Sequence, residues 1–360
     1  MLKNILITGG AGYIGSHTAR AFLDKGYGVV VVDDLSSGYL EAVPEGAGFV
    51  RANIHNVAEI IDIIRRNDIE GVIHFAAKII VPESITQPLD YYSNNTGGVL
   101  SMLHACKATG IDKLVFSSTA AVYGDAGSDL ITEDFPIQPI NPYGCSKYFS
   151  ERIIRDCGLA YGINSVILRY FNVAGAAHDI TNGQRSKIST HLIKLASEAA
   201  LGIIPHLKMT GTDFKTRDGT GIRDYIHVED LADLHTLAFE YLENGGASDI
   251  FNCGYGHGYS VREVIDTMKK VSGIDFPVIE SERRPGDAAT LVASNAKIKK
   301  SFNWTPKRNN LELICRSAFQ WESIWQERLR EIKERELQLK KLREKNAGEN
   351  IKERSFQPSA

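Results

Sequence analysis

Cysteine is scarce in this chain of 360 residues: it has five, and no two of them form a CxxC pair. Such an odd, scattered set is neither a disulfide framework nor a structural zinc site, so we expect no bound metal. We interpret the thiols as buried or incidental groups in a reducing compartment. They are Cys106, Cys145, Cys157, Cys253 and Cys315.

Long hydrophobic runs and an excess of basic residues are also missing. No stretch reaches the roughly 18 uncharged apolar residues of a membrane span, and the N-terminal apolar run is too short for a signal peptide. Lys and Arg number 41 against 44 Asp and Glu, whereas proteins that neutralise nucleic-acid backbones usually carry a basic excess. We therefore expect a cytoplasmic protein with no membrane span and no nucleic-acid partner.

Short apolar runs alternate with helical patterns along the chain, as in parallel sheets that are covered on both faces. We therefore expect an α/β fold: a Rossmann-type doubly wound parallel sheet with helices on both faces, plus a smaller α/β substrate domain. Strands are expected at residues 3–8, 29–32, 72–75, 114–116, 165–168 and 249–252. Helices are expected at residues 17–25, 57–67, 97–109, 189–201 and 228–243.

Three glycines follow the first expected strand and open the first helix, with the GxxGxxG spacing of Gly9, Gly12 and Gly15. Such a turn lets the backbone approach a pyrophosphate closely, and the free N–H groups at the helix start face the anion. Asp33 closes the second expected strand, where a carboxylate accepts from the ribose hydroxyls of an adenosine. A 2′-phosphate would meet that carboxylate and no nearby Arg, so the sequence favours NAD over NADP.

Tyr143 and Lys147 have the YxxxK spacing, which places a phenol and an ammonium on one face of a helix. A nearby cation favours the phenolate, so Tyr143 is a candidate base near neutral pH. Residues 116–119 end an expected strand with three hydroxyls, at the edge where parallel sheets bind ligands. A bare YxxxK spacing is common by chance, but the ordered set of glycines, acid, hydroxyls and YxxxK is much more specific.

These motifs resemble the extended short-chain dehydrogenase/reductase family, and within it the NAD-dependent epimerases and dehydratases of nucleotide sugars. The similarity is greatest to the 4-epimerases of UDP-sugars and extends over about residues 3–325. The segments that carry it are TGGAGYIGSH (8–17), HFAA (74–77), PLDYY (88–92), NN (94–95), FSSTAAVYG (116–124), RYFN (169–172) and GTGIRDYIHV (219–228).

The resemblance implies an isomerase that interconverts UDP-galactose and UDP-glucose through a transient 4-keto sugar, with NAD tightly bound. Tyr143 would remove the O4 proton, and Thr119 would hydrogen-bond O4. Lys147 would bind the nicotinamide ribose and lower the pKa of Tyr143. The family also implies a homodimer.

Binding residues follow from the same resemblance, with arginines whose planar forks match the oxygens of a diphosphate. The implied cofactor-binding residues are Gly9, Gly12, Tyr13, Ile14, Gly15, Asp33, Asn53, Ile54, Phe75, Ala76, Ala77, Asn95, Ser117, Tyr143, Lys147 and Tyr170. The implied substrate-binding residues are Thr119, Asn172, Arg223, Arg284, Asp287 and Leu291.

Two of these positions depart from the usual family residue. Asn53 stands where relatives have Asp, and its side-chain oxygen can still accept a hydrogen bond from the adenine amine, without charge. Leu291 stands where a Tyr restricts the sugar pocket to hexoses and a small residue admits N-acetyl sugars. Activity on UDP-N-acetylhexosamines therefore stays open.

The nearest alternative is another nucleotide-sugar epimerase or a 4,6-dehydratase of the same family. Such dehydratases carry acidic residues directly after the Ser/Thr position, and this chain has Ala120 and Ala121 there. A binding module that only senses NAD need not keep Thr119, Tyr143 and Lys147 together. The sequence thus favours an enzyme that epimerises.

Two domains and a tail are expected from these assignments. Residues 1–174, joined by about 228–255, would bind NAD, and residues 175–227 and 256–325 would bind the UDP-sugar. Residues 326–360 would form a charged tail, helical or disordered, because thirteen of the nineteen residues in 327–345 are charged. A frayed tail, a partner-binding helix and a membrane-surface helix are the alternatives for this segment.

Overall fold

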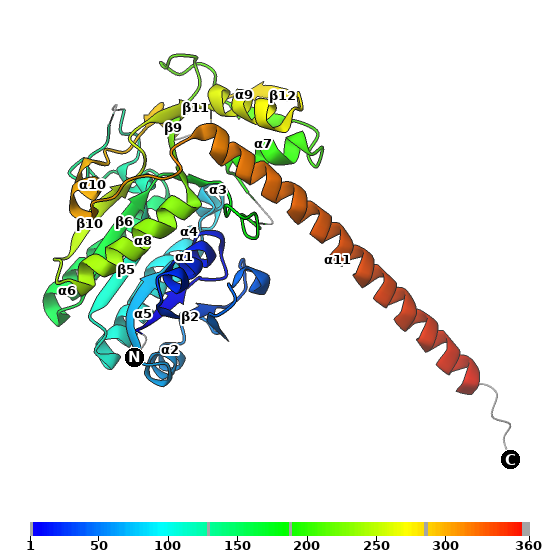
Figure 1. Cartoon of the computed structure of the whole chain (residues 1–360), viewed down its shortest axis with the longest axis horizontal. Helices are drawn as coiled ribbons and strands as arrows, with labels where there is room; N and C mark the ends of the chain where they lie inside the picture. Colours follow the sequence, from blue (N-terminus) through cyan, green and yellow to red (C-terminus); the bar gives the residue numbers. More distant parts are fainter. Residues whose placement is uncertain (1–2, 128–129, 187–188, 284–286, 355–360) are drawn as a thin grey trace.

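A seven-stranded parallel sheet forms the centre of the computed structural model, which describes residues 3–127, 130–186, 189–283 and 287–354 (Figure 1). The strand order is β10-β6-β5-β4-β1-β2-β3, with every pair parallel. The strands are β1 (Asn4–Thr8), β2 (Gly28–Asp33), β3 (Gly48–Arg51), β4 (Ile69–His74), β5 (Lys113–Thr119), β6 (Asn164–Tyr170) and β10 (Asp249–Cys253).

The expected doubly wound sheet is confirmed, and six of its seven strands lie where the apolar runs predict them. The apolar pattern misses β3, a four-residue strand at the edge of the sheet. Its residues are only partly buried or exposed. An edge strand lacks the continuous apolar run that marks strands buried on both faces.

Helices cover both faces of this sheet, and each face has its own apolar core. On one face Phe239 is fully buried and makes edge-to-face contacts with Phe22 and Tyr27. The helices of that face are α1 (Tyr13–Asp24) and α8 (Val228–Glu243). The helices of the other face are α2 (Val57–Arg66), α5 (Gly97–Thr109) and α6 (Pro142–Tyr161).

Two smaller sheets lie beyond the carboxyl ends of the central strands. One contains β7 (Asn172–Ala174), β9 (Ile222–His227), β11 (Gly258–Ser260) and β13 (Thr290–Leu291), and the other β8 (Leu207–Thr210) and β12 (Val278–Ser281). The other helices are η1 (Leu40–Ala42), α3 (Val81–Thr86), α4 (Pro88–Tyr91), η2 (Tyr92–Thr96), η3 (Ala120–Tyr123), α7 (Leu192–Ala200), α9 (Val261–Ser272) and α10 (Ala296–Phe302). Because these two small sheets are separate from the central sheet, we retain the proposal of an NAD-binding domain and a UDP-sugar-binding domain.

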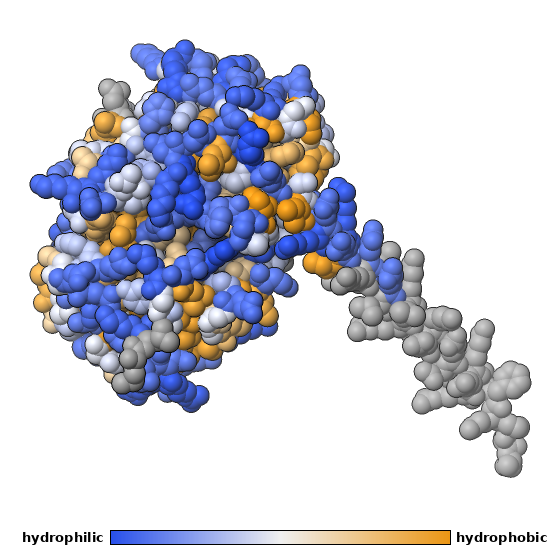
Figure 2. All heavy atoms as spheres, viewed as in Figure 1, coloured by the Kyte–Doolittle hydropathy of each residue, from blue (hydrophilic) through white to orange (hydrophobic). Residues whose placement is uncertain are grey.

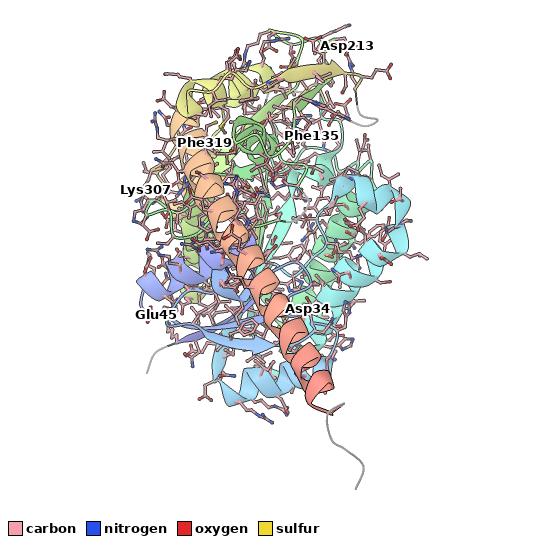
Figure 3. All side chains as sticks on the ribbon, turned by 90° about the vertical axis from the view of Figure 1, so that its right-hand side faces the viewer. Asp34, Glu45, Phe135, Asp213, Lys307 and Phe319 are labelled. Carbon is pink, nitrogen blue, oxygen red and sulfur yellow. The ribbon has the colours of Figure 1, made fainter. Side chains whose placement is uncertain are left out.

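A single long helix, α11 (Leu311–Arg354), contains most of the expected tail and begins well before it. Its first turns pack on the body, where Trp321 and Trp325 are buried and Glu322 forms an ion pair of 2.6 Å with Lys194. The helix then leaves the body, with exposed polar side chains on its next turns (Figures 1 and 2). Figure 3, turned by 90°, shows the side from which it emerges, with Phe319 near its start.

None of the helices in the described ranges is both long enough and apolar enough to span a membrane. Within the same ranges, no three His, Cys, Asp or Glu side chains are grouped as metal ligands.

Four histidines are buried in this fold. Burial lowers the pKa of His17 and of His235 to about 4. It lowers the pKa of His74 and of His227 to about 3. These imidazoles therefore stay neutral in the folded protein at pH values where an exposed imidazole is protonated.

The free energy of unfolding is expected to fall as the pH drops below about 6.5, because the unfolded chain then binds protons that the folded protein excludes. Each buried histidine contributes a slope of up to about 1.4 kcal/mol per pH unit until its own folded pKa is reached. Urea unfolding at a series of pH values measures the slope. His235→Gln is expected to flatten it, and His104→Gln, at an exposed position of α5, is the control. Equal slopes for wild type and His235→Gln would contradict this prediction.

Candidate active site

The turn between β1 and α1 has the close backbone contacts that the glycine spacing predicts. Gly9 has a φ of +69°, and a Cβ there would lie 2.7 Å from the Ala76 nitrogen. A Cβ at Gly15 would collide with the Gly9 carbonyl oxygen. No side chain caps the first N–H groups of α1, whose N-cap is Gly12. These free N–H groups fit a diphosphate, so the turn suits the pyrophosphate of a dinucleotide.

Asp33 lies at the end of β2, directly against this turn. Its two carboxylate oxygens accept hydrogen bonds from the N–H groups of Ala11, at 3.0 Å, and Leu35, at 2.8 Å. Burial raises the pKa of Asp33, and the two N–H donors oppose that rise. The carboxylate is thus held in place with lone pairs left for a ribose hydroxyl, as NAD requires.

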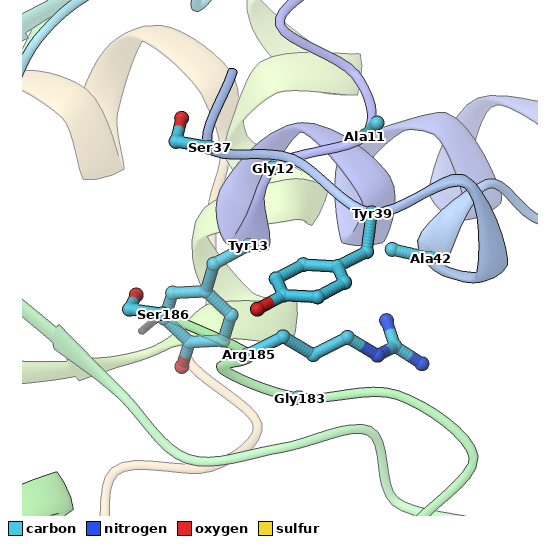
Figure 4. Close-up of a pocket in the computed structure, with 9 residues that line it drawn as sticks. All are labelled: Ala11, Gly12, Tyr13, Ser37, Tyr39, Ala42, Gly183, Arg185 and Ser186. Carbon is cyan, nitrogen blue, oxygen red and sulfur yellow. The ribbon is translucent and has the colours of Figure 1, made fainter. Parts of the chain in front are cut away.

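A pocket opens at the start of α1, with Tyr39 and Arg185 side by side at its wall (Figure 4). The residues that line it come from three segments of the chain: Ala11, Gly12, Tyr13, Ser37, Tyr39, Ala42, Gly183, Arg185 and Ser186. The first two segments follow β1 and β2, as expected for a dinucleotide site. The third, residues 183–186, was not expected to take part.

The predicted catalytic residues come together where α6 meets the end of β5. Tyr143 lies in the first turn of α6 and forms a hydrogen bond with Thr119, the last residue of β5. The Lys147 Nζ atom donates to the carbonyl oxygen of Ser117 at 2.8 Å. Gly144 permits this approach, since a Cβ there would lie 2.7 Å from the carbonyl oxygen of Ala121.

The protein alone does not produce the lowered pKa that we expected for Tyr143. Burial raises the pKa of Tyr143, and its hydrogen bond with Thr119 opposes that rise. Burial also lowers the pKa of Lys147 to about 7, against the charge of Glu151. Because desolvation disfavours both charged forms, a phenolate here depends on further positive charge in the site.

Glu151 and Arg169 form a buried ion pair of 2.6 Å beneath the catalytic residues. The Glu151 carboxylate also accepts from the hydroxyl of Ser118 on β5, and its charge raises the pKa of Lys147. Sequence reasoning missed this pair. Its signal was the spacing of Glu151, four residues after Lys147 and on the same face of the helix.

Some of the predicted cofactor-binding side chains are already hydrogen-bonded within the protein. The Asn95 amide donates to the Lys78 carbonyl and the Ser146 hydroxyl, and its oxygen accepts from the Lys78 N–H and from Asn94. Asn95 therefore holds the segment after β4 in place. The Ser117 hydroxyl pairs with the Tyr170 hydroxyl on β6.

Asn53, the residue predicted to accept from the adenine amine, keeps one acceptor position of its side chain unused. Asn53 donates to Asp34 at 3.2 Å, and its oxygen accepts from the His55 N–H at 2.9 Å, which uses one of its two lone pairs. Ile54, the next residue, is buried.

Other predicted cofactor-binding residues are held by contacts within the protein. Phe75, next to Ala76 and Ala77 after β4, packs on the ring of His235. Tyr13 anchors its hydroxyl on the Gly175 carbonyl at 2.7 Å, and Ile14 packs on the core.

Several predicted substrate-binding residues lie together on the small sheet. The Arg223 guanidinium is 3.5 Å from the Asp287 carboxylate. Leu291 is the register partner of Arg223, and it packs on the apolar cluster of η3, the helix directly after Thr119. Asn172 donates to the Asp224 carbonyl at 3.5 Å, which ties β7 to β9. Arg284, the other predicted diphosphate ligand, lies outside the described residues.

The site combines free helical N–H groups, a ribose acceptor, the partly buried phenol of Tyr143 and the buried amine of Lys147. This combination suits a Rossmann-type enzyme that uses a bound dinucleotide to oxidise and reduce a hydroxyl carbon. Comparison with known proteins makes the class specific. The chain belongs to the NAD dependent epimerase/dehydratase family, whose model matches residues 5–254. Its cofactor is NAD.

Similar proteins cover almost all of the chain before the protruding part of α11. A UDP-glucose 4-epimerase of Azospirillum brasilense is 53% identical over 319 residues, which are 88% of this chain and 91% of the relative. The crystal structure of UDP-glucose 4-epimerase from Brucella ovis in complex with NAD is 40% identical, with a TM-score of 0.86, and the match covers 88% of this chain and 98% of that one. The UDP-Glc/GlcNAc 4-epimerase from Campylobacter jejuni is 46% identical, with a TM-score of 0.79, and the match covers 89% and 99%.

Thr119→Val is expected to lower kcat by about 100-fold, because it removes the hydroxyl that bonds to the Tyr143 phenol. That hydrogen bond lowers the pKa of Tyr143, so its loss moves the Tyr143 limb of the pH profile of kcat to higher pH. Thr119→Ser keeps the hydroxyl and serves as the control. A Thr119→Val profile that overlays that of wild type would exclude this role.

Proposed function

We propose that the chain catalyses the interconversion of UDP-galactose and UDP-glucose by inverting carbon 4 of the sugar. The observation that carries this proposal is the Thr119–Tyr143–Lys147 set directly beside Ala120 and Ala121. Similar proteins that are named UDP-glucose 4-epimerase support the same substrate class.

Bound NAD supplies a hydride acceptor and donor for carbon 4 of the sugar. The Tyr143 oxygen takes the proton of the 4-hydroxyl, and the Thr119 hydroxyl bridges the two oxygens. The Lys147 Nζ atom donates to the Ser117 carbonyl, and Lys147 would also hold the nicotinamide ribose of bound NAD. In its charged form Lys147 would favour the phenolate of Tyr143. Lys147 is buried and Tyr143 is partly buried, which limits the access of water to the transient 4-keto sugar. Tyr143 returns the proton to O4 after the sugar has turned its other face.

Dehydration is the competing reaction on this scaffold, and it requires an acid to expel water from the neighbouring carbons. Ala120 and Ala121 stand directly after Thr119 in η3, and Ala121 donates its N–H to the Thr119 hydroxyl at 3.1 Å. Neither side chain carries an acidic group that could protonate a leaving hydroxyl. Epimerisation needs no such group, so we place it ahead of dehydration.

Residues 172, 223, 284 and 287 are proposed to bind the UDP-sugar, with Leu291 at the sugar end of the pocket. Leu291 packs on the apolar cluster of η3, the helix that directly follows Thr119. A Leu side chain occupies less space than a Tyr, which leaves room for an N-acetyl group. We therefore include UDP-N-acetylhexosamines among the proposed substrates.

A homodimer and a cytoplasmic location are part of the same proposal. The homodimer is supported by exposed apolar side chains on α3, α4, α5 and α6 and just before α3, which favour burial against a second copy. They are Ile79, Ile85, Leu89, Leu100 and Phe149. The second rests on the sequence, with its five scattered cysteines.

Purified protein incubated with UDP-galactose and no added cofactor is expected to form UDP-glucose, detected by coupling to UDP-glucose oxidation. Tyr143→Phe is expected to lose at least about 100-fold in kcat, because it lacks the proposed base but keeps the ring. Tyr148→Phe, on the same helix, is the control. A 4-keto-6-deoxy sugar in place of UDP-glucose, or full activity of Tyr143→Phe, would contradict the proposal.

Leu291→Tyr is expected to lower kcat/KM for UDP-N-acetylgalactosamine by about tenfold relative to UDP-galactose, because the larger ring fills the space for the acetyl group. Paired assays on the two substrates measure the ratio. Leu291→Met, of similar volume to wild type, is the control. An unchanged ratio of kcat/KM values in Leu291→Tyr would contradict the proposal that Leu291 lines the sugar pocket.

A further inference from the structure

Arg185 is a buried cation at the wall of the pocket in Figure 4. Only 5% of its surface is exposed. One guanidinium nitrogen donates to the Asn182 side-chain oxygen at 2.5 Å, and the Nε atom has no hydrogen-bond partner. Within the described part of the chain, no carboxylate lies within ion-pair distance of it. Arg20 differs from Arg185 in this respect, because Arg20 forms an ion pair with Asp179 at 2.8 Å.

Two tryptophans of α11 hold this guanidinium in position. Its central carbon lies 4.7 Å from the ring centre of Trp321 and 5.4 Å from that of Trp325. Trp325 also meets the ring of Tyr39 edge-on at 5.4 Å, and Trp321 donates to the Gln184 carbonyl at 3.1 Å. Aromatic faces stabilise a cation but do not neutralise its charge, so the guanidinium of Arg185 remains a positive charge at the pocket.

The opposite wall of the pocket is positive as well. Gly12 and Tyr13 begin α1, whose first N–H groups lack a side-chain cap. The Tyr39 N–H donates to the Ala11 carbonyl at 3.0 Å, so the segment that carries Tyr39 lies directly on the dinucleotide turn. A helix N-terminus and a buried cation that lacks a carboxylate partner thus share one small pocket. That combination favours a bound anion.

We propose that Arg185 is a cofactor-binding residue that supplies positive charge for the diphosphate of NAD, held at the pocket by Trp321 and Trp325. This proposal rests on the NAD-dependent function above and extends it. It gives α11 a part in retaining the cofactor, although α11 lies beyond the residues that match the family model.

The charge is tested by Arg185→Gln. NAD content after gel filtration and the rate of NAD release during dialysis are measured, neither of which depends on activity. Arg185→Gln is expected to release NAD at least tenfold faster than wild type. Arg185→Lys, which keeps the charge without the planar fork, is expected to lie between them. Arg20→Gln, which removes an arginine that already has a carboxylate partner, is the control and is expected to match wild type.

The role of α11 is tested with Arg185 intact. Trp325→Ala is expected to release NAD several-fold faster than wild type. Trp304→Ala is the matched control, since Trp304 and Trp325 are both 6% exposed but Trp304 stacks on Tyr255, away from the pocket. Equal NAD release by the two tryptophan variants would overturn the role of α11.

The two proposals fail in different ways. Wild-type protein that carries no NAD would contradict the proposed function itself. Wild type that carries NAD, together with Arg185→Gln that releases it no faster, overturns only the role of Arg185. If Arg185→Gln does not fold, Arg185→Lys and Trp325→Ala decide the matter, and wild-type NAD retention in both overturns the proposal.

Discussion

The contact between α6 and the carboxyl end of β5 is the interaction on which the catalytic arrangement depends. Lys147 reaches the Ser117 carbonyl at 2.8 Å and Tyr143 reaches Thr119 only because Gly144 leaves room for the carbonyl oxygen of Ala121. One turn further, Glu151 bonds to the next residue of the strand, Ser118. The helix is therefore fastened to the strand at successive turns, and the reacting groups lie in a fixed geometry before any substrate binds.

The buried charged side chains discussed above differ in whether they have a partner of opposite charge. Glu151 pairs with Arg169 and Lys194 pairs with Glu322, each at 2.6 Å, as the high cost of desolvation requires. Arg185 is buried to a similar degree and is surrounded by aromatic rings instead. A charge that the fold leaves without a counter-ion is explained most simply by a ligand that brings one.

Much of the central fold was predictable because burial on both faces of a parallel sheet produces continuous apolar runs. The edge strand β3 has no such run and was missed. The long helix α11 was divided at residue 326, since composition changes there from mixed to charged while the backbone continues unbroken. The family resemblance implies that Asn95 contacts the cofactor, and it does not reveal that both ends of this amide are already hydrogen-bonded within the protein.

The sequence by itself determined most strands and helices of the central sheet, the glycine turn and the YxxxK spacing of Tyr143 and Lys147, because these depend on local patterns. Only the tertiary structure decided in which direction the pKa values of Tyr143 and Lys147 move and which residues line the pocket. Burial raises the pKa of Tyr143 and lowers that of Lys147, and desolvation depends on every neighbour in space. The tryptophans of α11 reach Arg185 from more than 130 positions away through packing, and no local pattern of residues predicts such a contact.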